Sequence, residues 1–148
     1  MKIKRLALLT LNNLLVGIGN LMVKLDIRHI KMKYFVSKNG EIAKIEIKAI
    51  NDAGYSEYEK DRVEAVKKFG DKDDKGELKT NENGTVNIKD IEGFNKEIEG
   101  LKEKHKKLFE FLEEEVEIKL HQIKLSDMPD LPLGQADMDT LLPLILED

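Results

Sequence analysis

The sequence predicts a mainly α-helical protein of the α+β class, with long antiparallel helices, a small two-stranded antiparallel β-ribbon and a short carboxyl-terminal helix. Apolar residues recur at steps of three and four from Ile91 to Leu112, the period of a helix with one apolar stripe. After Glu115 the period changes to two, as in a half-buried strand. Charged residues make up 36% of the chain and aromatic residues 5%, a composition typical of helices with solvated faces.

The length of 148 residues suffices to bury one core, so we expect a single domain over residues 1–148. Within it we assign residues 1–70 to helices, 71–84 to an acidic loop, 85–125 to a strand–helix–strand unit and 126–148 to an acidic carboxyl-terminal segment. The chain contains no cysteine, which excludes disulfides and thiolate chemistry.

The amino-terminal segment predicts a buried helix from Arg5 to Val23. Its basic start and the apolar run that follows superficially resemble a secretory signal or a membrane helix. However, Asn12, Asn13 and Asn20 interrupt the run, no small-residue cleavage site follows, and the span is marginal for a bilayer. We therefore expect no membrane partner.

Residues 26–51 fit two structures. Asn39-Gly40 favours a type I′ turn, and a hairpin about it would pair Tyr34 with Ile45 on one face. A helix is the alternative, because apolar residues also recur at helical spacing. These residues are Ile27, Ile30, Tyr34, Ile42, Ile45 and Ala49. The local pattern favours the hairpin, which would cover residues 31–50.

The next helix is predicted to run from Ser56 to Gly70. Ser56 is a suitable amino-terminal cap, and Glu57 and Glu59 lie in the first turn, where the helix dipole favours anions. Gly70 ends the helix.

The acidic loop after Gly70 matches a calcium-binding loop in part. The matching positions are Asp71, Asp73, Gly76, Leu78 and Glu82. Lys75 places a positive charge where the fifth position needs an oxygen ligand, and a strand follows in place of a second helix. We therefore interpret residues 71–82 as a solvated turn, with a hairpin tip at Asn83-Gly84 and no bound metal.

The central segment begins with a short strand at residues 85–89, which we expect to pair with residues 116–124. Asp90 is the predicted cap of the long helix between these strands. His105 lies on the apolar stripe and is either a pH-sensitive residue or a packing histidine; we favour the packing histidine. Lys102 to Lys107 is basic, but without interleaved aromatic residues it does not predict nucleic-acid binding.

Charge is distributed unevenly along the chain. Residues 1–50 carry 10 Lys or Arg against 3 Asp or Glu, a net +7, so residues 51–148 carry −11 of the total of −4. We interpret this asymmetry as attraction between the two ends, within the fold or between subunits. The last amphipathic segment, residues 135–146, is expected to dock on the first helix of its own chain, with a partner protein as the alternative.

The sequence gives little support to catalysis. His29, His105 and His121 lie in different segments, and none is accompanied by a recognisable acid and nucleophile. Phosphate-binding glycine loops and the common hydrolase motifs are missing from the sequence. We therefore expect no enzymatic activity and assign no catalytic, cofactor-binding or metal-binding residue.

Four segments resemble a family of short, uncharacterised proteins encoded by tailed bacteriophages and prophages. The segments are EYEKDRVEAVKKFGDKDDKGEL, FNKEIEGL, EEEVEIKLHQIKLSDMPD and MDTLLPLILED. The motifs that correspond are Lys38-Asn39, Glu59 to Arg62, Asp71 to Gly76 and Glu115 to Ile118. The resemblance implies that residues 26–51 are helical and pack beside the long central helix, so we prefer the helix to the hairpin. The family has no established activity, and the resemblance assigns no role to individual residues.

These observations favour a non-enzymatic phage accessory or structural protein. It would self-associate, or bind another phage protein, through helical faces of the coiled-coil type. The alternative is a small phage effector that binds and inhibits a host protein, such as a defence component, through its acidic carboxyl-terminal surface. Either would work in the host cytoplasm or in the virion, without a cofactor, nucleic acid or a membrane as partner.

Overall fold

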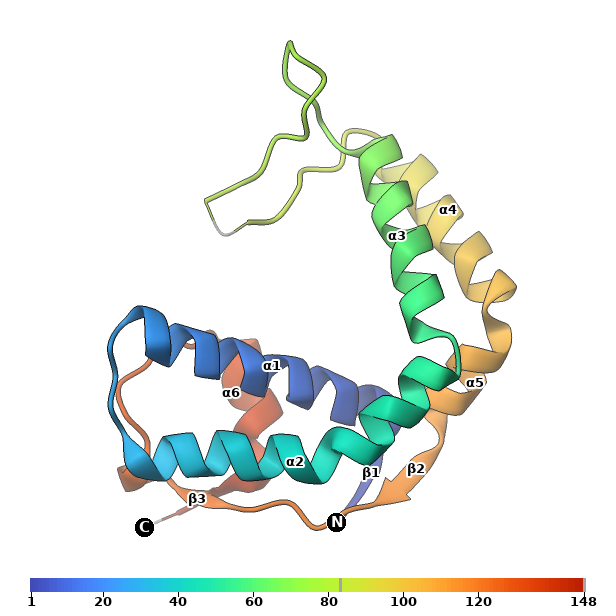
Figure 1. Cartoon of the computed structure of the whole chain (residues 1–148). Coiled ribbons are helices and arrows are strands. Elements are labelled where there is room, and N and C mark those ends of the chain that lie inside the picture. Colours follow the sequence, from blue (N-terminus) through green and yellow to red (C-terminus); the bar gives the residue numbers. More distant parts are fainter. Residues whose placement is uncertain (83, 148) are drawn as a thin grey trace. The chain divides into compact units, whose positions relative to one another are not determined.

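The computed structural model describes all residues except 83 and 148. Its described residues are 64% helical and confirm the mainly α-helical class (Figure 1). The α-helices are α1 (Arg5–Lys24), α2 (Ile30–Asp52), α3 (Tyr55–Phe69), α4 (Ile91–Lys104), α5 (Lys106–Glu113) and α6 (Gln135–Leu141). The short elements are the strands β1 (Lys2–Lys4), β2 (Glu115–Glu117), β3 (Ile123–Lys124) and β4 (Ile145–Leu146), and the 3₁₀ turns η1 (Leu125–Asp127) and η2 (Leu142–Leu144).

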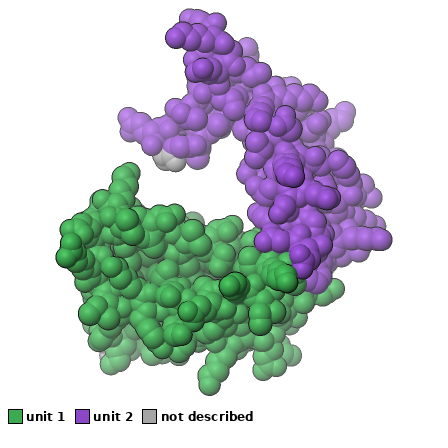
Figure 2. Space-filling view, in the orientation of Figure 1, with its two compact units in different colours: residues 1–49, 112–148 green, residues 50–111 purple. Residues whose placement is uncertain are grey.

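The chain divides into two compact units (Figure 2). Unit 1 contains residues 1–49 and 112–148, and unit 2 contains residues 50–111. The two ends of the sequence therefore belong to one unit, which agrees with their opposite charges. The expectation of a single domain stays a prediction.

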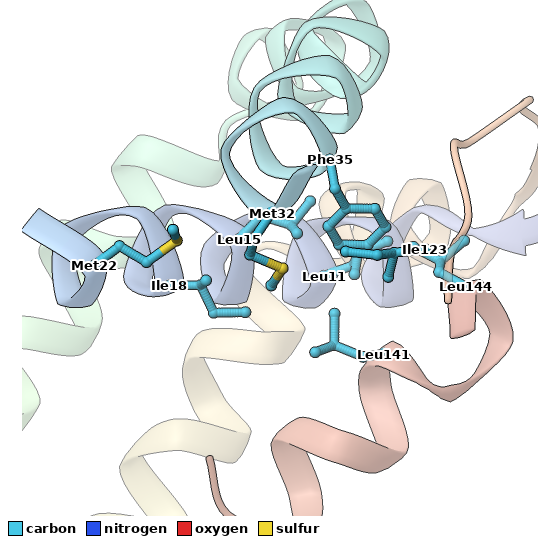
Figure 3. Packing of buried hydrophobic residues seen from close by; sticks show 9 residues of the cluster. All are labelled: Leu11, Leu15, Ile18, Met22, Met32, Phe35, Ile123, Leu141 and Leu144. Carbon is cyan, nitrogen blue, oxygen red and sulfur yellow. The ribbon is translucent and has the colours of Figure 1, made fainter. Parts of the chain in front are cut away.

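The core of unit 1 lies between α1, α2 and the carboxyl-terminal segment (Figure 3). α1 contributes side chains at steps of three and four, as an amphipathic helix requires, and α2 packs antiparallel to it. Nine buried residues form the main cluster: Leu11, Leu15, Ile18, Met22, Met32, Phe35, Ile123, Leu141 and Leu144. The predicted first helix and the docking of the carboxyl-terminal segment on it are both confirmed.

α1 also has the composition of a membrane span. Among the described residues it is the helix with sufficient length and hydropathy, and 33% of its apolar window is buried. Core helices and amino-terminal signal sequences share these properties. In unit 1, α1 contributes Leu11, Leu15, Ile18 and Met22 to the protein core.

The antiparallel ribbon exists, but its predicted pairing was wrong. β2 pairs with β1, with Ile3 opposite Val116. Lysines of β1 lie opposite glutamates of β2, which favours this pairing. Residues 85–89 instead fold back locally, through bridges from Val86 to Thr80 and from Ile88 to Gly70. The predicted strand at 116–124 is also interrupted, since β2 ends at Glu117 and β3 begins only at Ile123. β3 pairs with β4 in parallel.

Residues 30–52 form a helix, so the hairpin favoured by the local pattern was wrong and the helix implied by the resemblance is confirmed. The buried side chains of Met32, Phe35 and Ala43 recur at helical spacing. A helix turns all three toward the core, whereas a strand would point successive side chains to opposite faces. The packing partner of α2 within unit 1 is α1, whereas the resemblance implied the central helix.

Unit 2 is built on the packing of α3 against α4. Asp90 caps α4 as predicted, because its side chain accepts a hydrogen bond of 3.0 Å from the backbone N–H of Gly93. The long central helix is not continuous, since α4 ends at Lys104 and α5 begins at Lys106. His105 forms the cap between them.

The residues that begin and end α3 do so for other reasons than those predicted. Ser56 is not the cap, because α3 begins at Tyr55 after Gly54, whose φ of 105° suits glycine. Gly70 does end the helix, but with an ordinary φ of −69°. A Cβ atom there would lie 2.6 Å from the side chain of Leu78 and 2.7 Å from the carbonyl oxygen of Val66. Close packing, rather than a left-handed backbone, therefore requires glycine.

Candidate protein-interaction site

The side of α2 that points away from the core of unit 1 carries large apolar side chains. Ile30 is 83% exposed, Tyr34 54% and Ile45 79%. They follow one line on the helix together with Lys38 and Glu41, since steps of three and four return to the same side. We name these five residues the outward stripe of α2. Tyr34 also contacts the ring of His121, but Ile30 and Ile45 stay largely exposed. The outward stripe is therefore a candidate contact surface.

The opposite side of α2 is fastened to the segment after β2 by Asn39, whose side chain is completely buried. Its amide nitrogen donates to the carbonyl oxygen of His121 at 3.1 Å, and its amide oxygen accepts from the N–H of His121 at 2.7 Å. The side-chain amide thus pairs with the backbone as a neighbouring strand would. The ring of Tyr34 meets the His121 ring edge-on at 5.7 Å. These contacts fix the rotation of α2 and hence the direction of its outward stripe.

The middle of the outward stripe is an ion pair. Lys38 Nζ lies 2.8 Å from Glu41 Oε2, and both side chains remain accessible to solvent. The hydrogen bond from Lys38, followed by its charge, lowers the pKa of Glu41 below its ordinary value. The same contact raises the pKa of Lys38. Both groups are therefore charged at neutral pH, between the apolar side chains of Tyr34 and Ile45.

Unit 1 also contains a groove of about 530 Å³, which we name the amino-terminal groove. Its apolar wall comes from Met1, Ile3, Leu6, Ala7, Leu11, Pro143 and Leu144. Its polar lining residues include Lys4, Glu113 and Asp139. Lys4 pairs with Glu113 at 2.6 Å, and the ammonium group of Met1 balances the charge of Asp139. The charged lining residues therefore sum to zero beside an apolar wall. Such a groove is suited to an apolar side chain.

The histidines singled out in the sequence have separate partners. Nδ1 of His29 accepts from the N–H of Met32 at the start of α2, and His121 pairs with Asn39. His105 lies 2.8 Å from Asp61. It also packs edge-on against the ring of Tyr58, with 5.6 Å between the ring centroids. His105 is thus a packing residue of unit 2 that also holds a carboxylate.

The acidic loop uses its carboxylates to shape its own backbone. Asp73 Oδ1 accepts from the N–H groups of Lys75 and Glu77, each at 2.9 Å. Asp71 pairs with Lys79 at 3.5 Å. Across the described part of the chain, no three His, Cys, Asp or Glu residues are placed to hold a metal ion together. Asn83, half of the predicted hairpin tip, lies outside the described residues.

The attraction predicted between the two ends of the chain is confirmed within unit 1. Lys4 pairs with Glu113, Arg5 pairs with Glu114, and Lys31 pairs with Asp127 at 2.6 Å. Each pair joins the basic amino-terminal part to the acidic carboxyl-terminal part. These charges stabilise contacts inside the unit and leave fewer groups for a partner.

Sequence reasoning identified the three apolar residues of the outward stripe but not their exposure, and it did not identify Lys38 or Glu41. Ile30, Tyr34 and Ile45 were placed on one side of the helical alternative, which was expected to pack against the rest of the chain. α2 carries apolar residues on two opposite sides, and periodicity alone does not tell which of them the core covers.

Comparisons with models of protein families, with curated proteins and with solved structures give no match. Function is therefore inferred from the surfaces described above.

Proposed function

We propose that the chain is a non-enzymatic bacteriophage accessory or structural protein that acts through protein–protein contacts and self-associates, in the host cytoplasm or in the virion. The observation that carries self-association is the outward stripe of α2, with Ile30, Tyr34 and Ile45 largely exposed. The assignment to bacteriophages is supported by the sequence resemblance described above.

The energetics favour a weak, reversible association. Complete burial of an isoleucine side chain contributes about 1.5–3 kcal/mol, and two copies of the outward stripe supply four isoleucines and two tyrosines. Against this, association costs about 4–15 kcal/mol in lost freedom of motion. The two ranges largely cancel, so the net free energy of association is small and we expect a dissociation constant that is micromolar or weaker. Such an affinity suits assembly at high local concentration.

The test is sedimentation velocity of the wild-type chain from about 1 to 300 μM, a range that brackets a micromolar dissociation constant. We expect the mass to rise from 17.0 kDa towards twice that value. Ile45→Lys should keep the chain monomeric. Val23→Lys is the matched control, because Val23 is also 79% exposed but lies on α1. A wild-type chain that stays monomeric throughout contradicts the proposal.

A small effector that binds a host protein is the second candidate, and the amino-terminal groove is the observation that favours it. The groove is largely apolar and its charged lining residues balance, so its ligand would be an apolar side chain. Ala7→Trp should fill the groove. Capture of a host protein by the wild type, lost in Ala7→Trp, would support this candidate; capture that is equal for both chains would refute it.

A further inference from the structure

We propose that two copies of the chain pair through the outward stripe of α2 with the two helices antiparallel and related by a two-fold axis that passes between residues 39 and 40. The inference rests on the proposed self-association and specifies its geometry. In such an isologous contact the same surface of each subunit meets the other. A surface can do this only if it is complementary to itself after rotation.

The order of residues along the stripe has this property. Lys38 and Glu41 lie equally far from the midpoint between residues 39 and 40, and so do Tyr34 and Ile45. Antiparallel pairing therefore places Tyr34 opposite Ile45 of the partner subunit, and Lys38 opposite Glu41 of the partner subunit. The same two contacts recur on the other side of the axis, so apolar meets apolar and cation meets anion at these four positions. Ile30 would lie opposite Ala49 of the partner subunit.

The side chains also share the required direction. At 100° per residue, Tyr34, Glu41 and Ile45 lie within a narrow sector of α2, with Ile30 and Lys38 at its edges. Asn39, although it is next to the axis in sequence, is buried on the opposite side and stays engaged with His121. Pairing therefore requires no change in the hydrogen bonds between Asn39 and His121.

Charge selects the orientation. A parallel pair in register would bring Lys38 against Lys38 of the partner subunit and Glu41 against its own copy. The antiparallel pair exchanges one ion pair within each chain for two between chains. Exposed ion pairs contribute little affinity, but like charges placed opposite each other disfavour the wrong arrangement.

The contact is small. The stripe from Ile30 to Ile45 spans about 24 Å of helix. A single pair of helices of this length lies at the low end of the range of specific interfaces. The dimer is therefore expected in the micromolar range, and changes in single charges should shift it measurably.

The experiment reverses one charge at a time. Lys38→Glu leaves two carboxylates in the stripe and Glu41→Lys leaves two ammonium groups, so each variant alone places like charges opposite each other. We expect each to dimerise at least about 10-fold more weakly than the wild type in sedimentation velocity. An equimolar mixture of the two should form a mixed dimer with near wild-type affinity, since every cation then faces an anion.

The matched controls are Lys67→Glu and Glu64→Lys. These residues form an exposed pair of the same i,i+3 type at 2.8 Å on α3, and their reversal should leave association unchanged. Circular dichroism confirms that each variant is folded. If the wild type dimerises and both Lys38→Glu and Glu41→Lys dimerise as strongly as the wild type, the antiparallel geometry is wrong, whereas the proposal of self-association is kept. If the wild type never dimerises, both proposals are wrong.

Discussion

Replacement of Asn39 by alanine should destabilise unit 1 by about 2 kcal/mol. The buried amide makes two hydrogen bonds to the backbone of His121, at 3.1 and 2.7 Å, and each such bond contributes about 0.5–1.5 kcal/mol. Loss of the amide also leaves a small cavity, which adds to the cost. Alanine returns a few tenths of a kcal/mol because it is the better helix former. The net loss therefore remains well above the effect of a surface substitution.

The measurement is urea denaturation followed by circular dichroism at pH 7. Asn13→Ala is the control, because Asn13 is an exposed asparagine in the middle of α1. It should change the free energy of unfolding by no more than about 0.5 kcal/mol, in the stabilising direction. A loss below about 0.5 kcal/mol for Asn39→Ala would refute the view that this amide fastens α2.

Asn39→Asp adds a measurement of stability against pH to the same test. A carboxylate keeps the bond from the N–H of His121 but turns a negative charge toward the carbonyl oxygen of that residue. Burial and this repulsion should raise the pKa of the new carboxyl group. A raised pKa means that stability is present at low pH, where the protonated group can donate to the carbonyl, and is lost as pH rises through the folded pKa. The deficit relative to the wild type should therefore grow between about pH 4 and pH 7; a deficit independent of pH would contradict the argument.

Further predictions concern unit 2. Gly70→Ala should lower the free energy of unfolding in urea by about 1–3 kcal/mol, because the added methyl group would lie 2.6 Å from a leucine side chain. Gly100→Ala should raise the free energy of unfolding by about 0.5–1 kcal/mol, since nothing lies within 4 Å of its added methyl group. Equal effects of the two changes would contradict the packing described. The hydrogen bonds from Lys104 and His105 lower the pKa of Asp61 below 3.8, so its contribution to stability is present above that value and is lost as pH falls through the folded pKa. Asp61→Asn should lower the thermal midpoint at pH 7 and flatten its fall below about pH 4; an unchanged acid profile would show that this pair does not stabilise the unit.

Local signals in the sequence predicted the features that depend on neighbouring residues. The long apolar run identified α1. Asp90 identified the start of α4, because a helix cap involves residues only three apart. Gly70 marked the end of α3, although its reason is contact with Leu78. These features follow from a few adjacent side chains and need no knowledge of distant parts of the chain.

Features that depend on distant contacts could not be predicted in this way. β1 was interpreted as the basic start before the apolar amino-terminal run, since three residues give too little alternation to reveal a strand. Its partner β2 lies more than 100 residues away. Asn39-Gly40 carried a strong turn signal, which the burial of α2 and the bonds to His121 override. The exposure of the outward stripe likewise depends on which side of α2 the rest of unit 1 covers.

The most direct test of the central claim is a distance across the pair of α2 helices. The chain has no cysteine, so Lys33→Cys provides one site for a spin label, on α2 but beside the outward stripe. In the antiparallel pair the two labelled positions are separated by thirteen residues of helix rise, or about 20 Å. Double electron–electron resonance at concentrations where the chain is dimeric should give a distance near this value. Dipolar broadening of the continuous-wave spectrum, which indicates the distance near 10 Å expected of parallel helices in register, would contradict the account. So would the absence of any distance between subunits.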